Sequence, residues 1–278
     1  MARDTSFYYS FLVLPADKRR AIVAVWDFCR AVDDAVDEAP AETSATEVRR
    51  WREEVARCFD GGAPATPQGQ ALQPLIARFD LPRSAFEALV EGVEMDLHGR
   101  RYETFDDLYQ YCIRVASAVG LMCVKIFGCQ DPRSRDYAID LGVALQLTNI
   151  LRDVPKDLEL GRVYLPLEDL VRFGVQEGDL GAEAMHAGQG VRSPKVKALL
   201  AFEAGRAREY YARADAALPR SDARRLVAAR IMGNIYRGIL SRIERAGYDV
   251  FSAVIRVPRQ QRALIAAGTW ARTLVTGR

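Results

Sequence analysis

The sequence predicts an all-α protein, and three observations support this fold class. Apolar side chains recur at spacings of three and four residues across 15–38 and 44–59, as they do along one face of a helix. Combinations typical of helix starts, such as Thr104 followed by Asp107, precede other apolar stretches. No alternating pattern of strand length appears, and no repeat or low-complexity tract divides the chain. We therefore expect residues 1–278 to form a single all-α domain.

Gly, Pro and helix-start residues divide the chain into further predicted segments. The first half is expected to contain helix 15–38 (ending before Pro40), helix 44–59, loop 61–70, a helix opened by Pro82 and Ser84 and ending near Leu97, and helix 104–127. The second half is expected to contain a helix opened by Asp131 and Pro132, a turn with a short extended piece at 161–166, a Gly-rich, mobile-looking segment at 174–190, and helices near 193–217, 221–246 and 259–274.

Composition excludes several classes of protein. The 49% apolar and 27% charged content is that of a soluble globular chain, and the longest apolar runs are shorter than the roughly 20 residues of a membrane span. Five cysteines without a CxxC pattern favour reduced thiols and a cytoplasmic location, and the N-terminus shows no apolar signal core. Two histidines exclude an HExxH metalloprotease and leave little for a Ser-His-Asp triad.

Charge is distributed unevenly along the chain. From Val191 onward there are 18 Lys and Arg residues against 6 Asp and Glu residues, although the whole chain carries only +2. A basic C-terminal part is suited to anionic lipid headgroups or to diphosphate, and arginines on solvated helix faces are the plainer alternative. No recognised nucleic-acid-binding motif accompanies these residues, so nucleic acid is not an expected partner.

The stretch QLTNILRDVPKD, 146–157, is the strongest chemical signal. Gln146, Asn149, Asp153 and Asp157 follow one another at spacings of three and four, which places their side chains along one face of a helix. The preceding residues are mostly apolar, so most of this helix should be buried. A buried stripe of amides and carboxylates is costly without a partner, and a hydrated divalent cation such as Mg²⁺ suits these oxygen ligands.

A second acidic turn of the same geometry occurs near the start of the chain. Asp33 and Asp37 are four residues apart within FCRAVDDAVDE, 28–38, and Arg30 lies three residues before Asp33. One such pair is weak evidence, because acidic residues are common on solvated helices. Two pairs, each embedded in apolar sequence and each beside an arginine, are much more specific. A di-iron carboxylate bundle is disfavoured because neither histidine has a glutamate three residues before it.

Several motifs together resemble the squalene/phytoene synthase family of trans-isoprenyl diphosphate synthases. They are SFYYSFLVLP (6–15), FCRAVDDAVDE (28–38), YCIRVASAVG (111–120), LQLTNILRDVPKD (145–157) and GRVYLP (161–166). Within the family, SFYYSF, EMDLHGRRYETFDDLYQYCIRVASAVG and REYYARA with ARIMGNIYRGIL most resemble the bacterial presqualene diphosphate synthases of hopanoid biosynthesis. The resemblance implies a class I isoprenoid synthase bundle of helices around a central apolar cavity.

The resemblance also implies roles for residues at matching positions. Mg²⁺ would be held by Asp33, Asp37, Asn149, Asp153 and Asp157, with Mn²⁺ as an alternative ion. The four aspartates and Tyr111 would be catalytic, and the substrate would be bound by Ser6, Arg30, Asp96, Gln146, Asn149, Arg152 and Tyr236. The alternatives are purely structural roles: a core tyrosine at position 111, a helix-ending Asp96 and a turn residue at Ser6. The sequence departs from the family at Pro155 and Lys156, and Pro155 is expected to tilt Asp157 relative to Asp153.

The activity implied is Mg²⁺-dependent head-to-head condensation of two farnesyl diphosphates to presqualene diphosphate and diphosphate. Phytoene synthesis, dehydrosqualene or squalene synthesis, and a non-catalytic scaffold of the same fold are the alternatives. NADPH is not expected, because no GxGxxG follows a predicted strand. Downstream pathway enzymes and the inner membrane surface are further candidate partners of a cytoplasmic protein.

Overall fold

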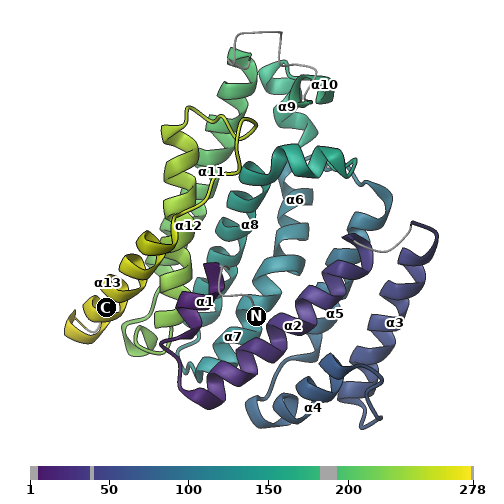
Figure 1. The fold of residues 1–278 in the computed structure, drawn as a ribbon, viewed down its shortest axis with the longest axis vertical. Coiled ribbons are helices and arrows are strands. Elements are labelled where there is room, and N and C mark those ends of the chain that lie inside the picture. Colours follow the sequence, from purple (N-terminus) through teal and green to yellow (C-terminus); the bar gives the residue numbers. More distant parts are fainter. Residues whose placement is uncertain (1–5, 38–40, 182–192, 277–278) are drawn as a thin grey trace.

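The longest helix, α8 (Arg133–Glu159), runs along the middle of a helical bundle (Figure 1). The computed structural model of the protein describes residues 6–37, 41–181 and 193–276. Within α8, the side chains from Leu141 to Leu151 are mostly buried, as their apolar character predicts. The helix packs against α7, α11 and α12, whose bounds are given below, and these neighbours cover its apolar surface.

The regular elements of the described residues are all helical, which confirms the predicted fold class. Before α8 they are α1 (Ser6–Phe11), α2 (Ala16–Asp37), α3 (Ala41–Phe59), α4 (Pro67–Phe79), α5 (Arg83–Glu94), the 3-10 turn η1 (Met95–His98), α6 (Phe105–Cys112), the π-helical turn η2 (Ile113–Ser117) and α7 (Ala118–Phe127). After α8 they are α9 (Leu167–Phe173), α10 (Glu177–Leu180), α11 (Pro194–Ala217), the 3-10 turn η4 (Arg220–Asp222), α12 (Val227–Arg245) and α13 (Arg259–Thr276).

Two predicted irregular segments contain helix. The loop expected at 61–70 was wrong in its second half, because α4 begins at Pro67. The Thr66 side chain accepts a hydrogen bond from the Gly69 backbone N–H, and Pro67 occupies the first turn, where its missing N–H costs nothing. The segment expected to be irregular at 174–190 contains α10, and its residues 182–192 lie outside the described part.

The predicted helix 104–127 is present as α6, η2 and α7 in succession. It begins as predicted, with the Thr104 hydroxyl and the Asp107 carboxylate each capping the other's backbone N–H. The π-helical turn packs closely on α8, because a Cβ atom added to Gly142 would lie 2.7 Å from the Ser117 Cα. The Ser117 hydroxyl also donates a 2.8 Å hydrogen bond to the Ile139 carbonyl of α8. The π turn and α8 are therefore held together at backbone distance.

By length and composition, Phe105–Phe127 would be able to cross a membrane, which the sequence analysis did not anticipate. In this fold the run is a bundle helix that contacts α5 and α8, and α7 also contacts α2. Several of its apolar residues pack against the core and also line a cavity, among them Val119, Cys123 and Val124. Its apolar composition is therefore explained by the core and the cavity wall.

Candidate active site

The two predicted acidic turns face one polar cavity of about 280 Å³. Asp33 and Asp37 reach it from the C-terminal end of α2, and Asp153 and Asp157 reach it from the last turns of α8. The helix spacing of four residues accounts for the shared direction within each pair. Asn149, one turn before Asp153, and Gln146, two turns before it, line the same cavity. The structure thus brings together two sequence motifs that are more than 100 residues apart.

Pro155 does not separate the second pair of carboxylates. The helix α8 continues through this proline to Glu159, and Asp153 and Asp157 both line the polar cavity. Pro155, which was expected to tilt Asp157 relative to Asp153, therefore leaves both carboxylates at one cavity. Lys156, the other departure from the family, is exposed on the surface.

The carboxylates of this cavity raise one another's pKa. Burial and the nearby charges of Asp37 and Asp96 raise the pKa of Asp33 to about 7. Burial and the charge of Asp153 raise the pKa of Asp157 to about 7, although Arg162 opposes the shift. The polar cavity therefore holds more negative charge than its own cations balance, which favours binding of a cation.

Two arginines line the polar cavity beside its carboxylates, and a third, Arg30, lies outside it beside Asp34. Arg152 donates from Nε to Asp153 Oδ1 at 2.8 Å and pairs with the second oxygen of the same carboxylate. Arg162 donates a 2.7 Å hydrogen bond to Asp37, and Arg30 lies 3.6 Å from Asp34. Guanidinium groups keep their charge and offer paired donors, so these side chains are suited to phosphate oxygens.

Arg162 was not singled out from the sequence. It lies in the turn after α8, within the GRVYLP segment, and this conspicuous segment directly after the second acidic turn was the available signal. Arg101 fixes the turn by donating to the Gly161 carbonyl at 3.1 Å and by pairing with Glu177 of α10. The turn is thereby oriented so that Arg162 faces the polar cavity.

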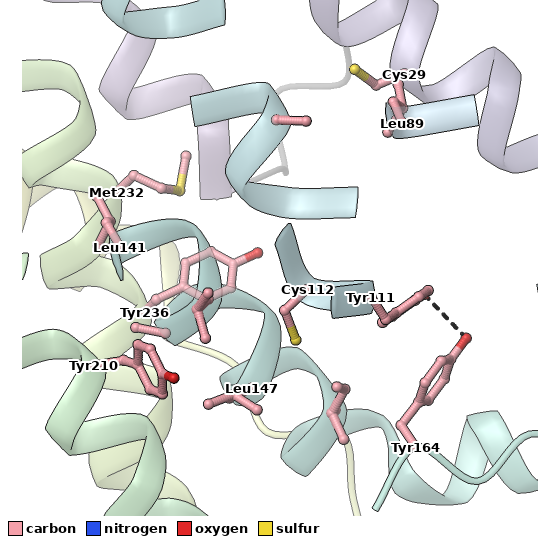
Figure 2. Packing of buried hydrophobic residues seen from close by; sticks show 14 of the residues in the cluster. Cys29, Leu89, Tyr111, Cys112, Leu141, Leu147, Tyr164, Tyr210, Met232 and Tyr236 are labelled. Atoms are coloured by element: carbon pink, nitrogen blue, oxygen red, sulfur yellow. Dashed lines mark hydrogen bonds between the residues drawn. The ribbon is translucent and has the colours of Figure 1, made fainter. Parts of the chain in front are cut away.

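A carboxylate held by two tyrosines forms one wall of the polar cavity. The hydroxyls of Tyr111 and Tyr164 each donate a 2.9 Å hydrogen bond to Asp96, one to each oxygen. The two rings stack with centroids 5.1 Å apart, and their hydroxyls are also within hydrogen-bonding distance of each other (Figure 2). Burial raises the pKa of Asp96 to about 6. The positive charge of Arg162 and the hydrogen bonds from the two tyrosines oppose this increase.

Tyr111 and Asp96 both line the polar cavity, and Tyr111 is at the same time a core tyrosine with a hydrogen-bonded hydroxyl. Tyr111 is buried, but its hydroxyl reaches the polar cavity, and Asp96 lies in η1 with its carboxylate directed into the same space. Tyr164, like Arg162, was missed by the sequence analysis, which quoted its segment without giving it a role.

A larger, mainly apolar cavity of about 430 Å³ adjoins the polar one. Both cavities are lined by Asp33, Val115, Gln146, Asn149 and Arg152, so the stripe of α8 forms the boundary between them. The apolar walls come from α1, α2, η2, α7, α8 and α12, and Figure 2 shows Leu141, Met232 and Tyr236 among the buried residues around it. This cavity could shield a long apolar chain whose polar end lies among the carboxylates and arginines.

The other predicted site residues are also placed. Arg30 and Tyr236 line the apolar cavity beside Arg152. Ser6 is the first residue of α1, and its side chain lies outside the described residues.

The polar cavity fits a hard divalent cation that is shared with a substrate. Among the residues that the structure describes, no three His, Cys, Asp or Glu side chains converge to enclose a metal ion by themselves. The Asn149 Oδ1 atom is nevertheless buried without a hydrogen-bond partner, and Asn149 lines the same cavity as Asp33 and Asp157, whose pKa values are raised. Mg²⁺ commonly takes one or two carboxylates and completes its octahedron with water and phosphate oxygens. The carboxylates and the Asn149 amide oxygen of the polar cavity therefore match the coordination preference of Mg²⁺.

A helical bundle with two acidic turns above an apolar cavity is the arrangement of an isoprenoid synthase. The chain belongs to the squalene/phytoene synthase family, whose model matches residues 1–263. Members of the family are prenyltransferase-type synthases, and this protein is an enzyme of that type.

Relatives with different named products are similar to the chain at comparable levels. A 15-cis-phytoene synthase of Synechococcus elongatus is 38% identical, covering 91% of this chain and 84% of its own. A presqualene diphosphate synthase of Rhodopseudomonas palustris is 35% identical, covering 95% and 92%.

Solved structures share the fold. A dehydrosqualene synthase in complex with a ligand superposes with a TM-score of 0.82 at 28% identity, covering 98% of this chain and 92% of its own. The squalene synthase HpnC from Alicyclobacillus acidocaldarius gives a TM-score of 0.75 at 32% identity, covering 87% and 89%.

Proposed function

We propose that the protein is a Mg²⁺-dependent presqualene diphosphate synthase that condenses two farnesyl diphosphates head to head. The observation that carries the proposal is the pairing of the two cavities. Five carboxylates, Arg152 and Arg162 line a space for diphosphate, and that space adjoins, along α8, an apolar space for prenyl chains whose lining includes Arg30.

The metal would be held by the two aspartate pairs with Asn149, and when bound it would neutralise the departing diphosphate. Arg30, Arg152 and Arg162 would bind the phosphate oxygens and stabilise the negative charge that develops as the bond from C1 to oxygen breaks. The apolar walls would exclude water from the allylic cation that remains.

The second step forms a cyclopropane and releases one proton. The 2,3 double bond of the second substrate attacks C1 of the cation, and loss of a proton from that carbon closes the three-membered ring. Burial raises the pKa of Tyr111 well above its usual range, so its hydroxyl keeps its proton at neutral pH. Since this hydroxyl donates to Asp96, it could accept the released proton while passing its own to the carboxylate. Released diphosphate is the competing acceptor.

The comparisons support more than one chain length. The presqualene diphosphate synthase and the two solved structures named for squalene or dehydrosqualene favour two C15 substrates. Phytoene synthase is the second candidate, because the phytoene synthases of Synechococcus and Synechocystis are 38% and 39% identical, slightly above the 35% of the presqualene relative. NADPH is not part of the proposal, which ends at the cyclopropane.

Product identification tests both candidates. The purified protein is incubated with Mg²⁺ and either farnesyl or geranylgeranyl diphosphate, and the lipid extract is analysed by mass spectrometry before and after phosphatase treatment. Presqualene diphosphate from the C15 substrate, formed without NADPH, is the expected result. Phytoene as the principal product would replace the proposal with the second candidate.

Matched aspartate variants test the site itself. Asp33→Asn and Asp153→Asn should each lower turnover by about 10²-fold or more, because each weakens stabilisation of the departing diphosphate. Asp80→Asn is the control: Asp80 pairs with Lys125 on the surface in a left-handed backbone conformation that asparagine tolerates. Full turnover in both site variants would show that the reaction takes place elsewhere.

A further inference from the structure

The C-terminal helix α13 exposes apolar side chains to solvent, and its protein-facing side combines buried polar residues with the apolar Ile265 and Ala266. Arg262, Thr269 and Thr273 are buried at 8%, 6% and 2% exposure. The opposite face carries side chains that follow one another at helical spacing and are exposed, with Leu264 at 71%, Leu274 at 47% and Val275 at 86%. Small residues, Ala267, Gly268 and Ala271, lie between them on the same face, and Trp270 borders it at 46% exposure. This set is called the outer face of α13 below.

Specific hydrogen bonds to α12 fix this orientation. Asn234 Nδ2 donates to Thr269 Oγ1 at 2.9 Å, and an Arg230 guanidinium nitrogen donates to Thr273 Oγ1 at 2.7 Å. On the N-terminal side, the Arg262 guanidinium lies 5.6 Å from the centre of the Tyr9 ring of α1. Rotating α13 to bury its leucines would break these contacts and leave buried polar groups unpaired. The outer face is therefore a fixed feature of the fold.

The charge around the outer face indicates which kind of surface covers it. α13 contains no acidic residue. Its Arg259 and Arg272 are exposed while Arg262 is buried against the protein, and the exposed Arg224 donates to the Leu274 carbonyl near its end. An apolar stripe on a helix that carries only positive charge suits an anionic lipid surface, into which such helices insert along the membrane plane. Packing of two copies through this face would bring like charges together, which opposes a self-interface.

The position of α13 connects the outer face to the apolar cavity. α13 packs on α1 and α12. Both helices contribute to the walls of the apolar cavity, α1 through Phe11 and α12 through Ala229 and Met232. Figure 1 shows α13 at the edge of the bundle, beside these two helices. If the proposed function is correct, substrate and product are lipids that must enter and leave this cavity.

We propose that the outer face of α13 docks the protein on an anionic lipid bilayer, with the α1–α12 side of the cavity next to the membrane. The proposed function gives this docking its biological purpose, but the docking itself is tested by vesicle binding, which does not depend on catalysis.

Vesicle flotation of the full chain tests the docking. Wild-type protein should float with vesicles of phosphatidylcholine and phosphatidylglycerol, and more weakly with phosphatidylcholine alone or at high salt. The double variant Leu264→Gln/Leu274→Gln should reduce partitioning by roughly tenfold or more, because two leucine side chains no longer enter the lipid. Val171→Gln on α9 is the matched control, since Val171 is 79% exposed and distant from α13, and its partitioning should be unchanged.

Fluorescence locates the contact independently. Brominated lipids should quench the tryptophan emission of the wild type, and Trp270→Phe should lose most of that quenching, since Trp51 is buried and Trp26 lines the cavity. Product formation by the double variant in detergent should match that of the wild type. If the proposed function were wrong, neither protein would form the product, but the flotation results would be unaffected.

Three results would overturn the proposal. They are wild-type protein that does not float, equal flotation of the double variant, and a lipid-free dimer that the double variant converts to a monomer in light scattering. The last would assign the outer face to a second copy of the chain.

Discussion

Replacing Gly142 with alanine should destabilise the protein, although alanine is the better helix former. A Cβ at this position would lie 2.7 Å from the Ser117 Cα and 2.8 Å from its backbone nitrogen. These are backbone atoms of η2, which cannot rotate away, so the overpacking cost is at the upper end of about 1–3 kcal/mol. Alanine returns up to about 1 kcal/mol of helix propensity. The net loss is therefore about 1–2 kcal/mol.

Gly205→Ala is the matched control in α11. Nothing lies within 4 Å of a Cβ added to Gly205, so only the propensity term applies and stability should rise by about 0.5–1 kcal/mol. In thermal unfolding followed by circular dichroism, the midpoint of Gly142→Ala should be about 2–6 °C lower than that of the wild type, and the midpoint of Gly205→Ala should be higher. Since η2 also carries Val115 into both cavities, turnover should fall in Gly142→Ala alone. Equal stabilisation by both alanines would refute the close-packing argument.

Three further predictions concern the polar cavity. Arg162→Gln should lower kcat/KM by about 10²-fold because it removes a charged donor from the phosphate space, and unchanged steady-state kinetics would contradict that role. Tyr164→Phe should move the acid limb of the pH–rate profile upward, because Asp96, whose pKa is about 6, loses one hydrogen bond to its charged form; an unmoved limb would exclude Asp96 as the titrating group. In EDTA, stability should fall as pH rises from about 4 to about 7, because folded Asp33 and Asp157 hold protons that the unfolded chain has released, and a flat midpoint against pH would contradict this.

The long helices could be predicted from the sequence because each has an apolar stripe that only a helix makes continuous. The short ones could not. Pro67 and Gly69 have the composition of a loop, yet Gly69 lies inside α4, where a Cβ would meet the Glu54 carboxylate at 2.2 Å. A contact with another helix thus requires glycine at this point, and local sequence does not contain that information.

The same distinction holds in the site. The four aspartates were predictable because helical spacing fixes their common direction. Arg162 and Tyr164 lie outside a helix, and contacts from distant parts of the chain hold this segment: Arg101 donates to the Gly161 carbonyl, and Tyr164 donates to Asp96. The sequence shows such a segment but not where its side chains point.

The arginine–carboxylate pairs described above imply an exchange of partners when the site fills. Arg152 occupies both oxygens of Asp153, and Arg162 occupies an oxygen of Asp37. A metal ion arriving alone must compete with these guanidiniums, and a phosphate arriving alone must compete with the carboxylates. When the two arrive as one complex, each carboxylate can exchange its guanidinium partner for the metal ion, and each guanidinium can exchange its carboxylate partner for a phosphate oxygen. If the proposed function is correct, loading by metal-bound diphosphate is therefore easier than loading by either component alone.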